Sequence, residues 1–154
     1  KIKDIWAARS AFLESISTSY RLLDENDIVV PVNEIANLAK FLGEMDKKYD
    51  VKVMYFGHAG DGNLHIYTLS NDMEEEEFKR QTHEFMLEVY KKTFEIGGQL
   101  TGEHGIGFGK TQYYESAIGS RNLQLQQEIK KVFDPRMILN PGKVCFRAEE
   151  ITAK

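Results

Sequence analysis

This sequence has almost no cysteine and no long apolar run, and these absences exclude several classes of protein. Cys145 is the single cysteine among 154 residues, so no internal disulfide can form and a reducing compartment is favoured. No apolar stretch approaches the roughly 20 residues of a membrane-spanning helix. No apolar block follows the basic Lys1–Arg9 segment as it would in a secretion signal. We therefore expect a cytoplasmic protein that reaches a membrane only through a partner complex.

An excess of positive charge is also absent. The formal net charge of −4 argues against a nucleic-acid binder, because such proteins usually carry a basic face. With 42% hydrophobic and 29% charged residues, the chain has the composition of one ordinary globular domain. Position 1 is not a methionine and the chain opens inside a predicted helix, so we expect a processed or shortened chain.

Hydrophobic periodicity predicts alternating strands and helices between Asp27 and Thr101. The expected order is a strand at 28–30, a helix capped by Asn33 and ending near Lys48, strands at 51–56 and 64–69, a helix from about Glu74 to Ile96, and a last strand at 99–101. A helix over Asp4–Leu23 precedes this set, and a helix over Gly119–Phe133 with an ordered tail follows it. The order predicts an α+β fold with an antiparallel sheet, the split βαβ or ferredoxin-like arrangement (βαββαβ).

The segment Gly57–His65, GHAGDGNLH, is the most informative part of the sequence. Asp61-Gly62 between two β-rich runs is a strong hairpin signal, because both central residues of a type I′ turn need positive φ. If these are the central residues, His58 lies directly opposite His65, with Cβ atoms about 4.5–5.5 Å apart. Asn63 falls on the same face. Two imidazoles at this spacing suit one metal ion; a hairpin with two structural histidines is the competing interpretation.

A second polar group lies in the glycine-rich stretch Thr101–Lys110, TGEHGIGFGK. Glu103 supplies a carboxylate, and two histidines with one carboxylate leave a divalent ion with open positions, as in catalytic sites. His104 then remains free to move a proton, which suits an imidazole at neutral pH. A structural turn and a phosphate loop are the alternatives. The phosphate loop is disfavoured because His104 stands where its first glycine is required.

Three motifs together bring a known family into view. They are Gly57–His65, Thr101–Gly107, and the tail from Phe133-Asp134-Pro135 to Ile138–Lys143. In this order and spacing they resemble the C-terminal domain of FAD-linked oxidases, the family of the glycolate oxidase flavin subunit, D-lactate dehydrogenases and D-2-hydroxyglutarate dehydrogenase. The resemblance covers residues 1–154 as one substrate-side domain. It implies a separate N-terminal FAD-binding domain over which this domain packs.

The resemblance implies a metal site and a base. His58, His65 and Glu103 would hold a divalent metal such as Zn, Mn or Fe. His104 would act as the catalytic base. The chemistry implied is oxidation of a D-2-hydroxy acid to a 2-oxo acid, with hydride transfer to FAD.

The resemblance also implies residues that bind substrate and cofactor. Arg9, in the helix motif Trp6–Arg9, would bind the substrate carboxylate through a bidentate pair. Asn63 is the second predicted substrate contact. Asn140 and Lys143 in the tail would return toward the flavin.

Three positions depart from the hydroxyglutarate enzymes of the family, which carry polar side chains there. Leu13 stands one helical turn after the arginine, Glu25 replaces a lysine, and Tyr67 lies near an expected asparagine. Loss of these polar contacts predicts a short monocarboxylate substrate, such as lactate or glycolate, rather than one with a second carboxylate.

The family context also suggests partners. An electron-transfer flavoprotein or an iron–sulfur subunit would accept the electrons, and a homodimer is left open. The chain by itself is expected neither to hold FAD tightly nor to oxidise substrate. Two other functions compete with this interpretation: a stand-alone metal-dependent hydrolase using His58, His65 and Glu103, and a non-catalytic ligand-binding or oligomerisation module.

Overall fold

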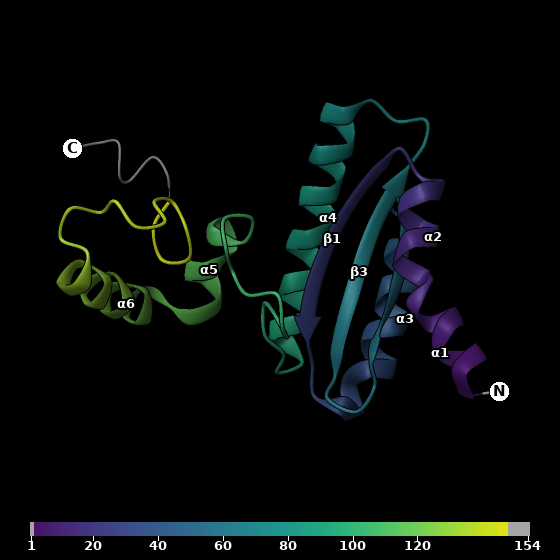
Figure 1. Ribbon diagram of the computed structural model, residues 1–154, viewed down its shortest axis with the longest axis horizontal. Helices are drawn as coiled ribbons and strands as arrows, with labels where there is room; N and C mark the ends of the chain where they lie inside the picture. Colours follow the sequence, from purple (N-terminus) through teal and green to yellow (C-terminus); the bar gives the residue numbers. More distant parts are fainter. Residues whose placement is uncertain (1, 148–154) are drawn as a thin grey trace.

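The computed structural model describes residues 2–147, with the side chains of Ala8 and Arg9 left out. It has an α+β body, in which a sheet lies between helices, and a C-terminal extension that leads away from this body (Figure 1). Helix α1 and the C-terminal extension lie at opposite ends of the described part (Figure 1). Within the described part, no helix is both long and apolar enough to cross a membrane.

Three strands form an antiparallel sheet in the order β1-β3-β2. The strands are β1 (Leu22–Val29), β2 (Lys52–His58) and β3 (Asn63–Ser70). The helices are α1 (Ile2–Ser10), α2 (Phe12–Ser19), α3 (Ile35–Met45), α4 (Glu75–Glu95), α5 (Thr111–Ile118) and α6 (Ser120–Phe133), and a 3-10 turn, η1 (Val32–Glu34), precedes α3. The α+β class with flanking helices confirms the prediction. The predicted last strand is reduced to one bridge, Gln99 to Val29, at the outer edge of β1.

The first strand is the main difference from the predicted elements. A helix reaching Leu23 was wrong, since α2 ends at Ser19 and β1 already begins at Leu22. Polar residues 24–27 look like a turn when taken alone. They become strand because β1 pairs with β3 along its whole length, from Leu22 opposite Ser70 to Val29 opposite Asn63, and such long-range pairing overrides local preference.

The predicted cap at Asn33 was also wrong. Asn33 lies inside η1, and α3 begins at Ile35 without a side-chain cap. Its amide instead donates a hydrogen bond to the Glu34 carboxylate. The chain turns into α3 through the tight 3-10 turn after Pro31, so the position that a cap would occupy is already helical.

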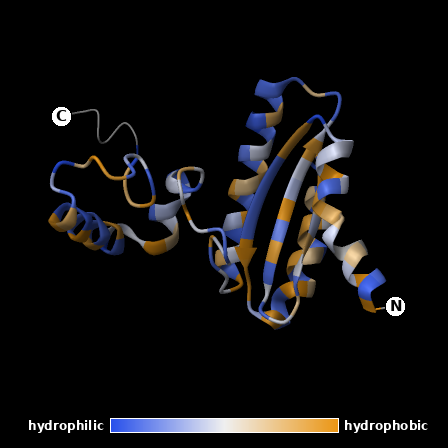
Figure 2. Cartoon of the chain, in the orientation of Figure 1, coloured by the Kyte–Doolittle hydropathy of each residue, from blue (hydrophilic) through white to orange (hydrophobic). Residues whose placement is uncertain are grey.

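One face of the sheet forms the main core against α3 and α4. Alternate residues of a strand point to opposite faces, and the even-numbered residues of β1 and β3 turn toward these helices. The fully or almost fully buried apolar residues here are Ile28, Val30, Leu38, Leu42, Ile66, Phe85, Met86 and Val89. Figure 2 shows hydrophobic bands alternating with more polar ones along β3, and mainly hydrophilic residues along α4. This layer makes the sheet a rigid platform.

The opposite face is covered only in part, by α2. Ile16 packs on Tyr67 and Leu69 in a second, smaller cluster, and the ring of Phe12 stacks on Phe56 with centroids 5.8 Å apart. Beyond this contact, the odd-numbered residues of β1 and β3 are polar except for Val29. The uncovered half of this face is therefore where the sheet can present chemistry.

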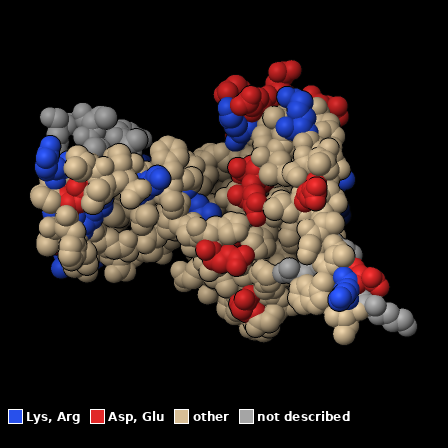
Figure 3. Space-filling view, in the orientation of Figure 1, with Lys and Arg blue, Asp and Glu red and all other residues tan. Residues whose placement is uncertain are grey.

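The C-terminal extension exposes much apolar surface. No side chain of α6 is buried, and Val132 and Phe133 are 77% and 82% exposed. The tail after Phe133 contains neither helix nor strand as far as Arg147, as predicted. Cys145 is buried within it, as predicted for a packed cysteine. In the view of Figure 3, acidic side chains are spread over the sheet-containing body, and basic ones occur around α6.

Candidate functional site

The β2–β3 hairpin brings His58 and His65 to the same face of the sheet. In the observed register His58 pairs with Asn63, and His65 pairs with Phe56. The prediction that the two histidines lie directly opposite each other was therefore wrong by two residues. They are diagonal neighbours instead, with ring centroids 5.6 Å apart. Asn63 shares their face, as predicted.

The register changes because the turn contains four residues, 59–62, instead of two. Gly62 has a φ of +82°, and its carbonyl accepts a hydrogen bond from the Val30 amide at 3.0 Å. A Cβ at Gly62 would lie 1.9 Å from the Val30 carbonyl oxygen, so this close approach requires glycine. The Asp61 carboxylate accepts a hydrogen bond from the Asn63 amide at 3.0 Å. Asp61 is thus a turn residue, as predicted from its type.

Glu103 meets both histidines from the glycine-rich loop. Its Oε1 lies 2.9 Å from His65 Nε2 and 3.7 Å from His58 Nε2, and one donor atom from each of the three residues lies within 4.8 Å of the others. Ligands bound tetrahedrally at 2.0–2.2 Å from an ion are about 3.4 Å apart. The measured distances fall on both sides of this value, so the donor set fits a divalent metal ion.

Two buried polar atoms also lack hydrogen-bond partners within residues 2–147. They are His65 Nδ1 and Asn63 Oδ1. Asn63 Oδ1 faces Gly102, where a Cβ would approach it to 2.3 Å, so a glycine is needed for the loop to reach β3. His65 Nδ1 lies 3.4 Å from Glu25 Oε1, an ion-pair distance without hydrogen-bond alignment. Both atoms lie within the histidine cluster.

His104 stands beside the three candidate ligands. Its ring centroid is 4.9 Å from that of His65, and its Nε2 lies 3.9 Å from Oε1 of both Glu103 and Glu25. Glu25, His65 and His104 form a second group of donors that could hold a metal. His65 belongs to both groups, with Nε2 toward Glu103 and Nδ1 toward Glu25.

Asp27 fixes the loop that carries Glu103 and His104. This side chain is fully buried in β1, and one of its oxygens accepts hydrogen bonds from the backbone amides of Gly102, Glu103 and His104, at 2.7, 2.7 and 3.1 Å. The Thr101 hydroxyl donates to the same carboxylate. Three successive amides on one oxygen determine how the loop lies against the sheet.

Lys110 is the charge partner of Asp27. Its ammonium group donates to the Asp27 carboxylate, to the Asp27 carbonyl oxygen at 2.7 Å and to the Leu100 carbonyl oxygen at 3.0 Å. Burial alone would raise the pKa of Asp27, but the hydrogen bonds from Lys110 and the loop amides outweigh burial and hold that pKa far below its usual range. Lys110 is only 6% exposed. Its ammonium is used inside the protein, which excludes the phosphate-loop interpretation.

The remaining predicted site residues lie outside this cluster. Arg9 falls in α1, and its side chain is outside the described part of the chain. Asn140 and Lys143 lie exposed in the C-terminal tail. This tail lies beside α6 and apart from the sheet (Figure 1). The tail touches the glycine-rich loop where the Val144 amide donates to the Gly107 carbonyl oxygen at 2.7 Å. The structure therefore brings together His58, Asn63, His65, Glu103 and His104.

Sequence reasoning missed three residues that build the site: Glu25, Asp27 and Lys110. Glu25 and Asp27 fell between the predicted helix and the predicted strand at 28–30. Only the register of β1, opposite Tyr67 and His65, puts them on the functional face. The apolar residues 28–30, directly after Asp27, were the one signal that the predicted strand could begin earlier. Nothing in the sequence pointed to Lys110 as its partner.

A family model for the C-terminal domain of FAD-linked oxidases matches residues 1–144. The chain belongs to this family. The motifs from which the resemblance was drawn lie inside the matched range. Family membership favours an oxidoreductase domain over a stand-alone hydrolase or an oligomerisation module.

The names of three relatives of this FAD-linked oxidase domain refer to three different substrates. The chain is 52% identical to a D-lactate dehydrogenase of Anaerostipes hadrus over 94% of its own length and 30% of that protein. It is 41% identical to the glycolate oxidase subunit GlcD of Bacillus subtilis, over 77% of its own length and 25% of that protein. It is 34% identical to a D-2-hydroxyglutarate dehydrogenase of Stutzerimonas stutzeri, over 94% of its own length and 31% of that protein. The chain thus spans between a quarter and a third of these relatives.

We expect Asp27→Asn to destabilise this domain by about 3–5 kcal/mol at neutral pH, because it leaves Lys110 buried without its counter-charge. The pH dependence should change too. The folded pKa of Asp27 is depressed, so its contribution is complete above the unfolded pKa of about 3.9 and is lost as pH falls toward the folded value. Urea unfolding between about pH 5 and pH 3 should show a shallower decline for the variant than for the wild type.

The exposed Asp72 provides the matched control. Asp72→Asn should keep the stability and the pH slope of the wild type. Equal stability and slope for Asp27→Asn would show that the buried pair does not hold the loop.

Proposed function

We propose that this chain is the metal- and substrate-binding domain of a flavin-dependent D-2-hydroxy-acid dehydrogenase. The observation that carries the proposal is the convergence of His58, His65 and Glu103, with donor atoms within 4.8 Å of one another. His104 lies beside them, within reach of a molecule bound there. The proposal also draws on the names of the relatives, each of which oxidises or dehydrogenates a 2-hydroxy acid by name.

The three candidate ligands would hold a divalent ion such as Zn, Mn or Fe. Two imidazoles and one carboxylate leave open positions for substrate, and such an ion supplies Lewis-acid polarisation of a hydroxyl or carboxylate oxygen. His58 is half-buried and Glu103 is exposed, so the site is open on one side. His65 is buried at the bottom, where β3 is fixed by strands on both sides. The protein's part is to hold the three donors on rigid strands and an anchored loop.

His104 has the position for proton transfer. Its backbone is tied to Asp27 by its amide, whereas its ring is 41% exposed and lies beside the three candidate ligands without being one of them. We propose that it accepts the proton of the substrate hydroxyl group. When bound, FAD supplies the oxidant that takes up hydride from C2, and loss of that proton and hydride yields the 2-oxo acid.

The surroundings of the histidines favour a short, uncharged substrate side chain. A hollow of about 320 Å³ beside His58 and His65 is lined mainly by Phe12, Leu13 and Phe56. Ser10 also lines it, but its hydroxyl already donates to the Trp6 carbonyl oxygen. These side chains offer no partner to a second carboxylate. Glu25, on the other side of His65, adds negative charge that would repel one. We therefore propose a monocarboxylate such as lactate or glycolate.

Other parts of the proposal rest on family membership and on the exposed surface. Arg9 is the proposed anchor of the substrate carboxylate and Asn63 a second contact, and Asn140 and Lys143 are the proposed contacts to FAD. The proposed partner that covers the apolar extension is an N-terminal FAD-binding domain. Exposed side chains that suit such a cover are Val132, Phe133, Ile138 and Leu139. An electron-transfer flavoprotein or iron–sulfur subunit as acceptor, and a cytoplasmic location, remain predictions.

We expect His104→Ala, made in the longer protein that includes the FAD-binding domain, to lower kcat by about 10²–10⁴-fold, because positioned proton transfer contributes that much. His83 is the matched control, since it lies on α4, where it is hydrogen-bonded to Tyr113, and is not part of the cluster. His83→Ala should stay within a few fold of wild type. Turnover of His104→Ala close to that of His83→Ala would rule out an essential base.

The substrate proposal has its own test in the same longer protein. We expect kcat/KM for D-lactate to exceed that for D-2-hydroxyglutarate by about 100-fold or more, because a desolvated charge without a partner costs several kcal/mol. Leu13→Lys should narrow this ratio. Leu87→Lys, at an exposed position of α4, should leave it unchanged. A preference for the dicarboxylate in the wild type would contradict the assignment.

A further inference from the structure

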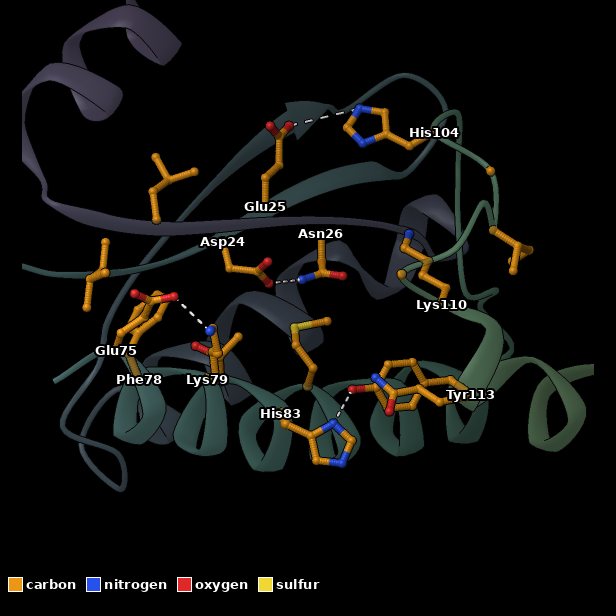
Figure 4. A pocket seen from close by; sticks show the side chains of 18 of the residues that line it. Asp24, Glu25, Asn26, Glu75, Phe78, Lys79, His83, His104, Lys110 and Tyr113 are labelled. Carbon is orange, nitrogen blue, oxygen red and sulfur yellow. Dashed lines mark hydrogen bonds and ion pairs between the residues drawn. The ribbon is translucent and has the colours of Figure 1, made fainter. Parts of the chain in front are cut away.

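Glu25 is a charged residue inside the candidate site to which the proposed function gives no part in metal binding or proton transfer. It lies on β1 opposite Tyr67, on the same face as His65. Figure 4 shows Glu25 and His104 on one side of β1, pointing toward each other. Asp24 and Asn26 turn the other way, toward α4, where Asn26 accepts a hydrogen bond from Tyr90. The alternation of the strand thus selects Glu25 for the functional face.

A buried tyrosine holds the Glu25 carboxylate in place. The Tyr67 hydroxyl donates a hydrogen bond to Glu25 Oε1 at 2.8 Å. Tyr67 is only 1% exposed and is packed against Ile16 and Leu69. Burial and the neighbouring Glu25 raise the pKa of Tyr67, so the phenol remains a hydrogen donor. The carboxylate is therefore oriented by a side chain that cannot move away.

The same carboxylate oxygen faces the unpartnered nitrogen of His65. Glu25 Oε1 lies 3.4 Å from His65 Nδ1, which has no hydrogen-bond partner within the described residues. A small rotation of the imidazole would align this contact. The other ring nitrogen, Nε2, lies 2.9 Å from Glu103 Oε1, on the side of the candidate metal ligands. His65 is thus placed between two carboxylates with different surroundings.

We propose that Glu25 is a positioning residue, which accepts the Nδ1–H of His65 and so turns the Nε2 lone pair toward the metal held with His58 and Glu103. This inference rests on the proposed metal site. A neutral imidazole has one donor and one acceptor nitrogen, so ligation through Nε2 requires the proton on Nδ1 and an acceptor for it. Histidines that bind metals usually donate their second N–H to such a group, and the loss of that partner typically weakens metal binding about 10–100-fold.

Zinc binding tests the proposal in the 154-residue chain. Titration calorimetry with Zn²⁺ should show about 10–100-fold weaker binding for Glu25→Gln than for wild type. Tyr67→Phe should weaken binding less, because it loosens the carboxylate without removing it. Glu44→Gln, at an exposed position of α3, is the matched control and should bind as wild type. Glu103→Gln removes a proposed ligand and should lower the affinity further than Glu25→Gln.

A second measurement separates positioning from general damage to the fold. In the zinc-loaded chain, nitrogen-15 NMR of the imidazoles should show the His65 Nδ1–H exchanging with water faster in Glu25→Gln than in wild type. The ring signals of His58 should stay in place, since the measured contacts of the Glu25 carboxylate are with Tyr67, His65 and His104. Folding of each variant is checked by circular dichroism.

The outcomes distinguish the two proposals. Wild-type zinc affinity in Glu25→Gln, or equal changes at His58 and His65, would overturn the role of Glu25. So would loss of zinc binding in Glu25→Gln with retention in Glu103→Gln, because Glu25 would then be a ligand in the group with His65 and His104. Absence of zinc binding in the wild type would instead reject the proposed metal site.

Discussion

The carboxylate of Asp27 is the interaction on which the candidate site depends. This buried carboxylate accepts hydrogen bonds from the backbone amides of residues 102–104 and from the Thr101 hydroxyl. The ammonium group of Lys110 neutralises its charge. Without this anchor, a stretch with glycines at 102, 105, 107 and 109 would have many accessible conformations. The anchor works because Asp27 is opposite His65 in the sheet, so the loop it holds is necessarily beside that histidine. A single buried charge thus connects the loop motif to the hairpin motif.

The two faces of the sheet have different roles: one packs in the core, and the other carries the candidate site. The even-numbered residues of β1 and β3 pack against α3 and α4 and keep the strands fixed. The odd-numbered residues lie on the face that α2 covers only in part, and they include Glu25, Asp27, Asn63, His65 and Tyr67. Because strand side chains alternate strictly, a shift of one residue in register would bury the chemistry and expose the core. The same pairing therefore maintains both the fold and the site.

Much of this arrangement was predictable from the sequence, and the failures have physical causes. The hairpin strands, α4 and α6 follow from apolar periodicity and glycine signals. The histidines share a face because two residues of loop extension preserve the alternation, even though their direct opposition was wrong. The start of β1 failed because Asp24–Asp27 is polar in isolation and becomes strand only through pairing with β3. The Asp27–Lys110 pair joins residues 83 apart, and no local pattern reports such a contact.

Two patterns stand out among the described residues: exposed apolar side chains and buried polar atoms without hydrogen-bond partners. Side chains such as Phe133 and Val132 stay exposed on α6, whereas polar groups such as His65 Nδ1 are buried on the sheet. The first pattern suits a covering domain, and the second suits the proposed contact of the His65 Nδ1–H with Glu25. The first pattern also agrees with the length of the relatives, which are about three times as long as this chain.

Anomalous X-ray scattering from crystals of the zinc-loaded chain would test the central claim most directly. The account predicts one strong peak bonded to His58, His65 and Glu103, with His104 beside it and unbound. A peak held by Glu25, His65 and His104, or no peak on this face of the sheet, would contradict it.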